Sequence, residues 1–372
     1  RLLNSKTRKD AYMLPRFDDI VDSLVGSSMY SKLDLRSGYW NVEMEEESKP
    51  KTAFSVGNLG FYEWNRLGFG LCNAPAQFQR LVERCMGDLH LRDCLVFIDD
   101  ILIFSKNFEE HIERLEAVFG KLAMHGLKLK PSKCELFMDS VVYLGHVISK
   151  QGIHTDPEKV SAIKTWPVPK NIKEMRQFLG FAGYYRRFIQ NYASIAEPLN
   201  ALLKGQCTQK KSKMKSRKRP TVVWIWGAIE QKAFDSLIVK LTSAPILAYA
   251  DYTKPFILHT DSSGTGLGAV LYQNQEGLEK VIAYASRGLK PSEKKYPTHK
   301  LEFLALKGAV TEKFHDYLCG NTFSVFTDNN PLTYVLTSAK LDATGHRWVA
   351  ALSNYNFTLS YKPGKLNTDA DG

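Results

Sequence analysis

Carboxylates that follow apolar, strand-like runs are the residues of this chain best suited to do chemistry. Asp99 and Asp100 stand side by side in LVFIDDILIF (95–104), between two runs of β-type residues. Burying an unpaired carboxylate is costly, so the pair needs compensation, and a divalent cation is one form of it. The alternative is an exposed hairpin tip, although two-residue tips prefer Gly or Asn, which allow positive φ. This feature alone leaves both interpretations open.

A third carboxylate, Asp34, follows a similar run in SKLDLRSGY (31–39). Taken alone, an Asp at a strand end is typical of a turn. Together, Asp34, Asp99 and Asp100 could form a two-metal site, in which ions about 3.5–4 Å apart hold the attacking and leaving oxygens of a phosphoryl displacement. Oxygen ligands and retained waters favour Mg²⁺, with Mn²⁺ as the alternative ion.

Four more acids occupy comparable positions in the second half of the chain. Asp261 ends the apolar run FILHT, Asp328 follows FSVFT, Glu302 lies one turn into a helical segment, and Asp371 closes NTDAD. Each one alone is most often a turn former, a first-turn helix acid or a cap. Position alone therefore assigns them no common function.

Composition narrows the class of protein. The 372 residues suffice for two or three domains, and no stretch approaches 18 uninterrupted apolar residues, so no membrane span is expected. The six cysteines form no C-x-x-C pair, which argues against a zinc site or a disulfide framework. Eight of the positive charges behind the net +11 lie between Lys204 and Arg219. This run could contact nucleic acid or act as a nuclear address, but a solvated loop is favoured.

Periodicity predicts the elements that must position the acids. Strands are expected at 30–35, 95–104 and 141–148, with helices at 75–89 and 109–125. A helical part begins at the N-cap sequence Asp156-Pro157-Glu158 and includes a helix at 228–241. Further strands are expected at 256–260, 268–273, 281–285, 323–327 and 356–361, with one helix over 299–318. The glycines between 264 and 268 are interpreted as a hairpin turn. The pattern predicts α/β and α+β layers.

Four ordered blocks then resemble Gypsy-class reverse transcriptases of LTR retrotransposons: SKLDLRSGYWNVEM, KTAFSVGNLGFYEWNRLGFGLCNAPAQFQ, LVFIDDILIFSK and VVYLGHVISKQGI. The resemblance implies a right-hand polymerase with partial fingers, a palm and a helical thumb, since the family's fingers begin upstream of Arg1. It also implies that Asp34, Asp99 and Asp100 bind the catalytic metals.

The same resemblance implies substrate contacts. Tyr39 stands where the family has an aromatic that blocks a ribose 2′-hydroxyl, although an ordinary core aromatic is the alternative. Phe69, Gly70 and Pro75 fall in the segment beside the incoming nucleotide and template. Tyr143 and Gly145 fall in the hairpin that holds the primer end.

The second half resembles ribonuclease H through TDSSGTGLGAVLYQ, HKLEFLAL, FTDNNPLTYV and NTDAD. The resemblance implies a mixed-sheet domain in which Asp261, Glu302, Asp328 and Asp371 bind two Mg²⁺ ions and activate a water against an RNA phosphodiester. Asp369 is a local rival of Asp371, which better matches the family's Ala-Asp register.

The resemblance as a whole implies an RNA- and DNA-directed DNA polymerase with ribonuclease H activity. The predicted domains are 1–150 (partial fingers and palm), 151–248 (thumb or connection, with the basic loop 204–220) and 249–372 (ribonuclease H). Implied partners are RNA/DNA hybrid, duplex DNA, dNTPs, a second copy in a homodimer, and the integrase and protease of a parent polyprotein, with no membrane. The family is expected in cytoplasmic virus-like particles or the nucleus. The alternatives are a nucleic-acid-binding fragment without catalysis and one subunit of a larger dimer.

Overall fold

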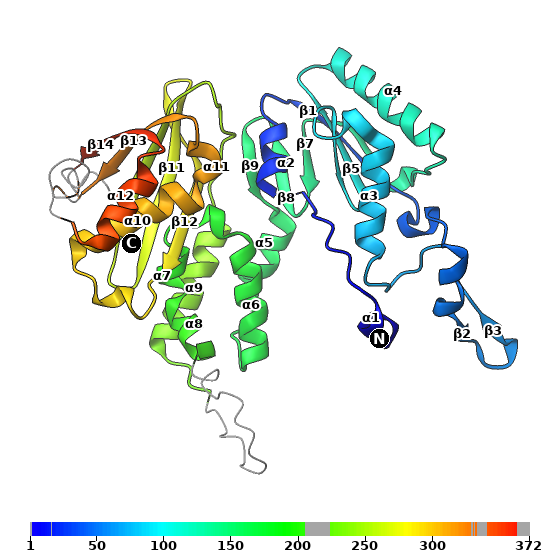
Figure 1. Cartoon of the computed structure of the whole chain (residues 1–372), viewed down its shortest axis with the longest axis horizontal. Helices are drawn as coiled ribbons and strands as arrows, with labels where there is room; N and C mark the ends of the chain where they lie inside the picture. The colour runs from blue at the N-terminus through cyan, green and yellow to red at the C-terminus, as the bar shows by residue number, and fades with distance from the viewer. Residues whose placement is uncertain are drawn as a thin grey trace, which may run out of the picture. The chain divides into compact units, whose positions relative to one another are not determined.

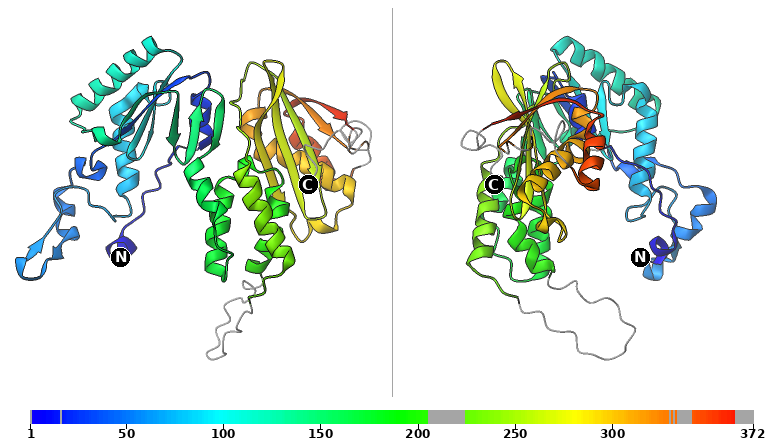
Figure 2. Two further views of the ribbon diagram at one scale, coloured as in Figure 1. Left: turned by 180° about the vertical axis from the view of Figure 1, so that it is seen from behind. Right: turned by 60° about the vertical axis from the view of Figure 1, so that its left-hand side comes forward.

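The computed structural model describes residues 2–15, 17–204, 224–328, 330, 332 and 341–362. Asp371, its rival Asp369 and the predicted basic loop beyond residue 204 therefore lie outside the described residues. The chain forms two compact units, unit 1 (Arg1–Gln151) and unit 2 (Gly152–Gly372) (Figures 1 and 2). Within the described residues, no helix is both long enough and apolar enough to cross a membrane.

Unit 1 is built on a four-stranded antiparallel sheet in the order β4-β5-β1-β6. Two amphipathic helices, α3 and α4, pack on one face of it (Figure 1). Leu33, Ile101 and Ile103 of the sheet share a buried cluster with Phe78 and Val118 of these helices. The bounds are β1 Met29–Asp34, β4 Cys94–Phe97, β5 Asp100–Ser105, β6 Glu135–Met138, α3 Ala74–Met86 and α4 Phe108–Met124.

Two predicted strands of unit 1 prove to be hairpins. The run at 95–104 divides into β4 and β5, and the run at 141–148 divides into β7 (Ser140–Tyr143) and β8 (His146–Ser149). Leu144 and Gly145 both have positive φ, as a two-residue type I′ turn requires. Each turn is only two residues long and begins with an apolar residue, Ile98 or Leu144, which is why periodicity alone merged each pair. The smaller elements are α1 Leu2–Lys6, α2 Phe17–Ser23, β2 Phe54–Ser55 and β3 Phe61–Tyr62.

The first half of unit 2 is helical. Asp156 caps α5 by accepting a hydrogen bond from the N–H of Glu158 at 3.0 Å, which confirms the predicted N-cap. Phe178 of α6 packs on Phe234 of α9 with ring centroids 4.5 Å apart. The bounds are β9 Gly152–Thr155, α5 Pro157–Lys164, α6 Ile172–Tyr184, α7 Tyr192–Ile195, α8 Glu197–Lys204 and α9 Ala228–Thr242.

A five-stranded mixed sheet in the order β12-β11-β10-β13-β14 forms the rest of unit 2. The central strand β10 is antiparallel to β11 and parallel to β13. Helices α10 and α12 cover the sheet (Figure 1), and Phe256 and Leu258 of β10 belong to the same buried cluster as Phe303 and Leu306 of α10. The bounds are β10 Phe256–Ser262, β11 Gly266–Gln275, β12 Leu278–Gly288, β13 Thr322–Thr327, β14 Asn356–Tyr361, α10 Thr298–Gly308 and α12 Ala343–Leu352.

The helix predicted over 299–318 is not continuous. After α10, residues Ala309–Lys313 form a π-helical turn, in which the N–H of Phe314 donates to the carbonyl of Ala309 at 2.8 Å, and α11 (His315–Leu318) follows. The apolar stripe whose steps of three and four predict this helix is nevertheless buried throughout: Phe303, Leu306, Val310, Phe314 and Tyr317. The same side chains thus stay buried although the backbone hydrogen bonds change from the α-helical to the π-helical pattern. The spacing of apolar residues cannot predict such a change.

Candidate active sites

A tight turn presents the first group of acids. Phe97 and Asp100 are paired across the β4–β5 hairpin, so the turn consists of Ile98 and Asp99. Ile98 has φ 53°, a left-handed conformation that a β-branched residue rarely adopts. The backbone is therefore a hairpin, as in the alternative left open by the sequence, but its tip is half-buried and not exposed. The turn also brings the acids of the metal interpretation together, since Asp34 lies directly opposite Asp100 in the β1–β5 register.

The electrostatics of this group are dominated by burial and mutual repulsion. Burial raises the pKa of Asp99, and the nearby carboxylates of Asp34 and Asp100 raise it further. Burial also raises the pKa of Asp100, against the opposing effect of Lys32, whose Nζ lies 3.5 Å from Oδ2 of Asp100. Lys133 Nζ lies 3.2 Å from Oδ2 of Asp34. Oδ1 of Asp99 is buried without a hydrogen-bond partner. A group of carboxylates in which one buried oxygen has no hydrogen-bond partner is suited to bind a divalent cation.

An open hollow of about 540 Å³ lies beside two of these acids, with Asp34, Gly38, Phe69, Asp99 and Lys133 among its lining residues, whereas Asp100 does not line it. Its volume is within the range of small-molecule sites. The Phe69 side chain is 61% exposed. The hollow therefore combines acidic, basic and aromatic groups that water and a charged ligand can reach.

The predicted substrate-contact residues differ in how exposed they are in the structure. Tyr39 is half-buried, with its ring centroid 5.1 Å from that of Phe69 and 5.5 Å from that of Phe78. Gly70 has φ 88°, and Pro75 is the second residue of helix α3. Tyr143 is fully buried, while Gly145 lies in the turn that follows it. Substrate contact by any of the six predicted residues stays a prediction, and the fully buried Tyr143 ring is not open to a substrate in this structure.

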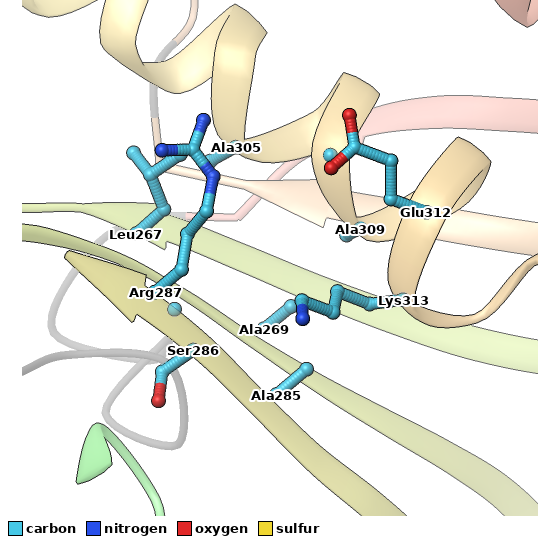
Figure 3. Close-up of a pocket in the computed structure, with 11 residues that line it drawn as sticks. Leu267, Ala269, Ala285, Ser286, Arg287, Ala305, Ala309, Glu312 and Lys313 are labelled. Atoms are coloured by element: carbon cyan, nitrogen blue, oxygen red, sulfur yellow. The ribbon is translucent and has the colours of Figure 1, made fainter. Parts of the chain in front are cut away.

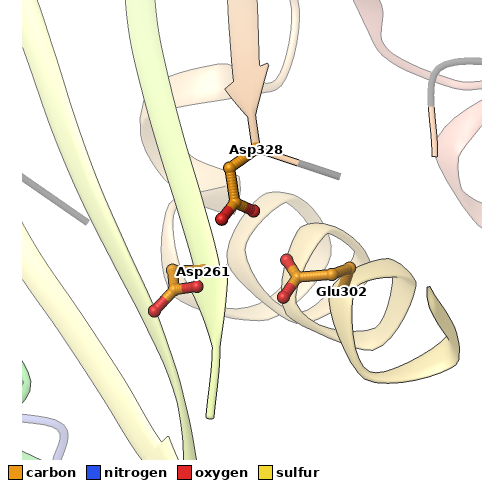
Figure 4. A group of neighbouring side chains, drawn as sticks. All are labelled: Asp261, Glu302 and Asp328. Carbon is orange, nitrogen blue, oxygen red and sulfur yellow. The ribbon is translucent and has the colours of Figure 1, made fainter. Parts of the chain in front are cut away.

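The second group of acids is gathered more tightly. Asp261 lies on β10, Glu302 on α10, and Asp328 directly follows β13 (Figure 4). Since β10 and β13 are parallel with His259 opposite Phe326, the residues two positions further along, Asp261 and Asp328, lie on the same face of the sheet as that pair. One ligand atom from each of the three acids lies within 4.8 Å of the others, and no other such group occurs among the described residues. The carboxylates of Asp34, Asp99 and Asp100 therefore do not all lie within this limit of 4.8 Å of one another.

Glu302 is the most constrained of these acids. It is 3% exposed, and the N–H and Oγ of Ser262 donate to its Oε1 at 3.1 and 2.6 Å. Oε2 is buried with no hydrogen-bond partner. Burial raises the pKa of Glu302 to about 8, assisted by the charges of Asp261 and Asp328. Three convergent carboxylates, one with an orphaned oxygen, fit a divalent cation that would compensate this burial.

The metal-free protein is expected to lose stability as the pH rises, because of Glu302. A carboxyl whose folded-state pKa exceeds its ordinary 4.5 keeps a proton that the unfolded chain releases, so the unfolding free energy falls between about pH 4.5 and 8. The steepest contribution of this group is about 1.4 kcal/mol per pH unit. Urea unfolding in EDTA at pH 5.5, 6.5 and 7.5 measures it. The Glu302→Gln variant should show a shallower slope, and equal slopes in the two proteins would contradict the assignment.

A separate small pocket lies between β11, β12 and the α10–π segment (Figure 3). Alanine side chains line it from both sides, Ala269 from β11 and Ala305 from α10, and Arg287 of β12 also lines it. The Arg287 guanidinium is already held by Glu293 at 2.7 and 3.1 Å. This pocket shares no residue with either carboxylate group and is not a candidate for the chemistry.

Sequence reasoning missed three residues that shape the two sites. Ser262 orients Glu302, Gly38 lies against Asp99, and Gln79 of α3 is hydrogen-bonded to the Ile98 turn. Ser262 and Gly38 follow or precede predicted site residues, but their types carry no signal of their own. Their roles depend on contacts across 40, 61 and 19 positions of the chain, respectively.

Two family models match the chain. The model described as "Reverse transcriptase (RNA-dependent DNA polymerase)" matches residues 1–148, and "RNase H-like domain found in reverse transcriptase" matches residues 226–325. The chain is 39% identical over 370 residues to the "Retrovirus-related Pol polyprotein from transposon opus" of Drosophila melanogaster, covering 99% of the chain and 36% of that protein. It is also 39% identical over 373 residues to the "Retrovirus-related Pol polyprotein from transposon gypsy" of the same species, covering 100% of the chain and 35% of that protein.

The "Transposon Tf2-3 polyprotein" of Schizosaccharomyces pombe is 30% identical over 374 residues, with 99% of this chain and 27% of that protein covered. The chain thus spans about a third of the length of the curated relatives it matches. Both units fall inside these alignments, because each covers nearly the whole chain.

Solved structures of foamy viral protease-reverse transcriptase share the fold. One in complex with dsDNA gives a TM-score of 0.79 at 24% identity, covering 97% of this chain and 73% of that chain. Another, in complex with RNA/DNA hybrid, gives 0.75 at 23% identity, covering 97% and 47%. The likeness confirms the predicted fold class, a polymerase-type unit followed by a ribonuclease H-like mixed sheet.

Proposed function

This chain belongs to the reverse transcriptase and ribonuclease H region of Gypsy-class retrotransposon Pol polyproteins, and we propose that it catalyses both DNA synthesis and RNA cleavage. In this proposal unit 1 extends a primer on RNA or DNA templates, and unit 2 cuts the RNA strand of the resulting hybrid. The observation that carries it is the convergence of Asp261, Glu302 and Asp328 with an orphaned Glu302 oxygen, since binding alone needs no such cluster.

The proposed polymerase site consists of Asp34, Asp99 and Asp100 together with the hollow that Asp34 and Asp99 line. These acids would hold Mg²⁺, or Mn²⁺ in its place, and the ions would supply charge for in-line phosphoryl transfer. Metal binding would release Lys133 and Lys32 from their ion pairs with Asp34 and Asp100. A free Lys133, which lines the hollow, is then available to a phosphate. The half-buried Tyr39 beside Phe69 would stand against the sugar of a dNTP.

The proposed ribonuclease site uses Asp261, Glu302 and Asp328 to hold the same kind of ion, which would activate a water and stabilise the leaving oxygen. Ser262 fixes the Glu302 carboxylate through Oε1 and leaves Oε2 for the cation. Asp371 is proposed as the fourth ligand on the family pattern alone, since it lies outside the described residues.

Substrates and partners are inferred from the relatives. The foamy viral neighbours are complexes with dsDNA and RNA/DNA hybrid, which supports both duplexes as ligands here. We also propose dNTPs as substrates, because the model that matches residues 1–148 describes a DNA polymerase, and integrase and protease as other products of a parent polyprotein, because the relatives are Pol polyproteins. A homodimer is proposed on the family pattern alone. Basic surface would track phosphates without reading bases, so affinity should fall steeply with salt.

The ribonuclease half of the proposal is tested with strand-labelled duplexes. With Mg²⁺, the chain should cut the RNA strand of an RNA/DNA hybrid and spare an RNA/RNA duplex of the same sequence. EDTA should stop the cleavage. Equal cleavage of the two duplexes would indicate a different nuclease activity, and no cleavage with either Mg²⁺ or Mn²⁺ would refute the assignment.

A Gly38→Ala substitution should impair DNA synthesis through Asp99. A Cβ at position 38 would lie 2.0 Å from Oδ1 of Asp99 and 3.0 Å from the ring of Phe78, so the carboxylate must move. A displacement of about 1 Å at such a site costs on the order of 10²-fold in rate. Single-nucleotide primer extension measures the loss.

Gly68→Ala is the matched control, since its added methyl would meet Trp64 at an ordinary 3.6 Å. It should extend primers at the unmodified rate. Full activity of Gly38→Ala would show that the position of Asp99 is not required for synthesis.

A further inference from the structure

Gln79 is a fully buried polar residue in the middle of α3, and its side chain reaches the turn that carries Asp99. Its Oε1 accepts the backbone N–H of Ile98 at 2.6 Å. Its Nε2 donates to the carbonyl of Val96 at 2.9 Å. One side chain therefore holds the backbone on two sides of Phe97, immediately before the turn closes.

The orientation of this amide is fixed from its other side. The same Nε2 donates to Oε1 of Glu83 at 2.6 Å, one helical turn further along α3. Oε2 of Glu83 in turn accepts a hydrogen bond from the Tyr12 hydroxyl. Because Glu83 and Val96 present only acceptors and Ile98 presents a donor, only one amide orientation satisfies all three contacts. Gln79 cannot flip without losing at least two of them.

The turn needs such support because its conformation is unfavourable. Ile98 has a positive φ and Asp99 does not, which is the pattern of a type II′ turn, where the first position normally belongs to Gly. A left-handed β-branched residue persists only when its surroundings impose the conformation. Two contacts do so here: Gln79 holds the N–H of Ile98, and the N–H of Leu35 donates to the carbonyl of Asp99 at 3.1 Å.

We propose that Gln79 is a positioning residue of the polymerase site, which holds the Ile98 turn so that the Asp99 carboxylate faces Asp34 and Asp100. The inference rests on the proposed function of unit 1. The hydrogen bonds of Gln79 continue through Glu83 to Tyr12. The segment that precedes α2 is therefore linked, across helix α3, to the Ile98 turn. Arg80 reinforces this coupling, since it binds Asp10 at 2.8 and 3.0 Å and lies over the ring of Tyr12.

The alternative is that Gln79 only stabilises the packing of α3 on β4. The two roles differ in what a substitution changes. A packing role predicts faster hydrogen exchange at many amides of unit 1 and a loss of both DNA synthesis and RNA cleavage. A positioning role predicts a local change at Ile98 and a fall in the rate of synthesis alone.

The test replaces Gln79 with Met, which keeps the length and apolar contacts of the side chain but removes its three hydrogen bonds. Hydrogen–deuterium exchange should be about tenfold faster at Ile98, as expected for one lost hydrogen bond. The amides of β1 should exchange as before. In single-nucleotide extension, kcat should fall about tenfold or more, while KM for the dNTP and the rate of hybrid cleavage stay within about twofold.

Gln77→Met is the matched control, because Gln77 lies on the same helix and is exposed. It should leave both exchange and extension unchanged. If Gln79→Met does not fold, Glu83→Gln provides a milder variant, and it should speed exchange at the same amide by a smaller factor.

The positioning role is overturned if exchange at Ile98 is unchanged, if hybrid cleavage falls together with synthesis, or if Gln77→Met has the same effect. Failure of the unmodified chain to extend primers would refute the proposed polymerase function instead. In that case, the exchange rate at Ile98 still decides whether Gln79 holds the turn.

Discussion

Replacing Asp99 with Asn is expected to abolish primer extension and to leave hybrid cleavage unchanged. Asp99 offers the buried, unpartnered Oδ1 of the first acidic group, and the neighbouring charges of Asp34 and Asp100 make a cation there favourable. An amide of the same shape removes that charge. Because the ion would supply most of the charge stabilisation, a loss of at least about 10³-fold is expected. Primer extension and RNA cleavage measured on the same preparation give the two rates.

The matched control is Asp88→Asn, which neutralises an exposed acid on the same unit. Asp88→Asn should extend primers at the unmodified rate. If Asp99→Asn still extends primers, the assignment of the polymerase site to this turn is wrong. If it also stops cleavage, the two activities do not belong to separate sites.

The reverse pattern is expected for Glu302→Gln: hybrid cleavage falls by about 10³-fold or more, and primer extension persists. The amide retains an oxygen for the two Ser262 donors but cannot supply the second carboxylate oxygen. Removing a buried carboxyl with a raised pKa should also make the metal-free protein more stable at neutral pH. Cleavage rates and urea unfolding in EDTA measure the two effects.

Glu279→Gln is the corresponding control, since Glu279 is an exposed acid on β12. It should change neither cleavage nor stability measurably. A Glu302→Gln variant that cleaves normally would remove Glu302 from the ligand set. If the Glu302→Gln variant were less stable than the unmodified chain in EDTA, the conclusion that burying the Glu302 carboxylate destabilises the metal-free protein would be wrong.

Local patterns predicted most elements because burial follows periodicity. The α10 stripe and the Asp156 cap were visible in the sequence, and both are present in the structure. The failures occur where the hydrogen-bond pattern changes without a change in apolar pattern. The turn at Ile98 has no Gly or Asn, and the π-helical turn after Gly308 keeps its apolar side chains inward.

The acids could be predicted as candidates because carboxylates after strands are chemically conspicuous. Their grouping could not, since it depends on strand register and helix docking: Asp261 and Asp328 meet only because β10 and β13 are parallel and in register. Supporting residues such as Gln79 and Ser262 are harder still. A glutamine in a helix and a serine in a strand are ordinary until their partners are known.

One assay tests the central claim, that a single chain carries two separate metal-dependent sites. The substrate is an RNA/DNA hybrid with a recessed DNA primer, labelled on the primer and on the RNA with different dyes, and incubated with Mg²⁺ and dNTPs. We predict that the primer lengthens and the RNA shortens, that EDTA stops both, that Asp99→Asn loses only extension, and that Glu302→Gln loses only cleavage. Binding of the hybrid with neither product, in Mg²⁺ and in Mn²⁺, would contradict it.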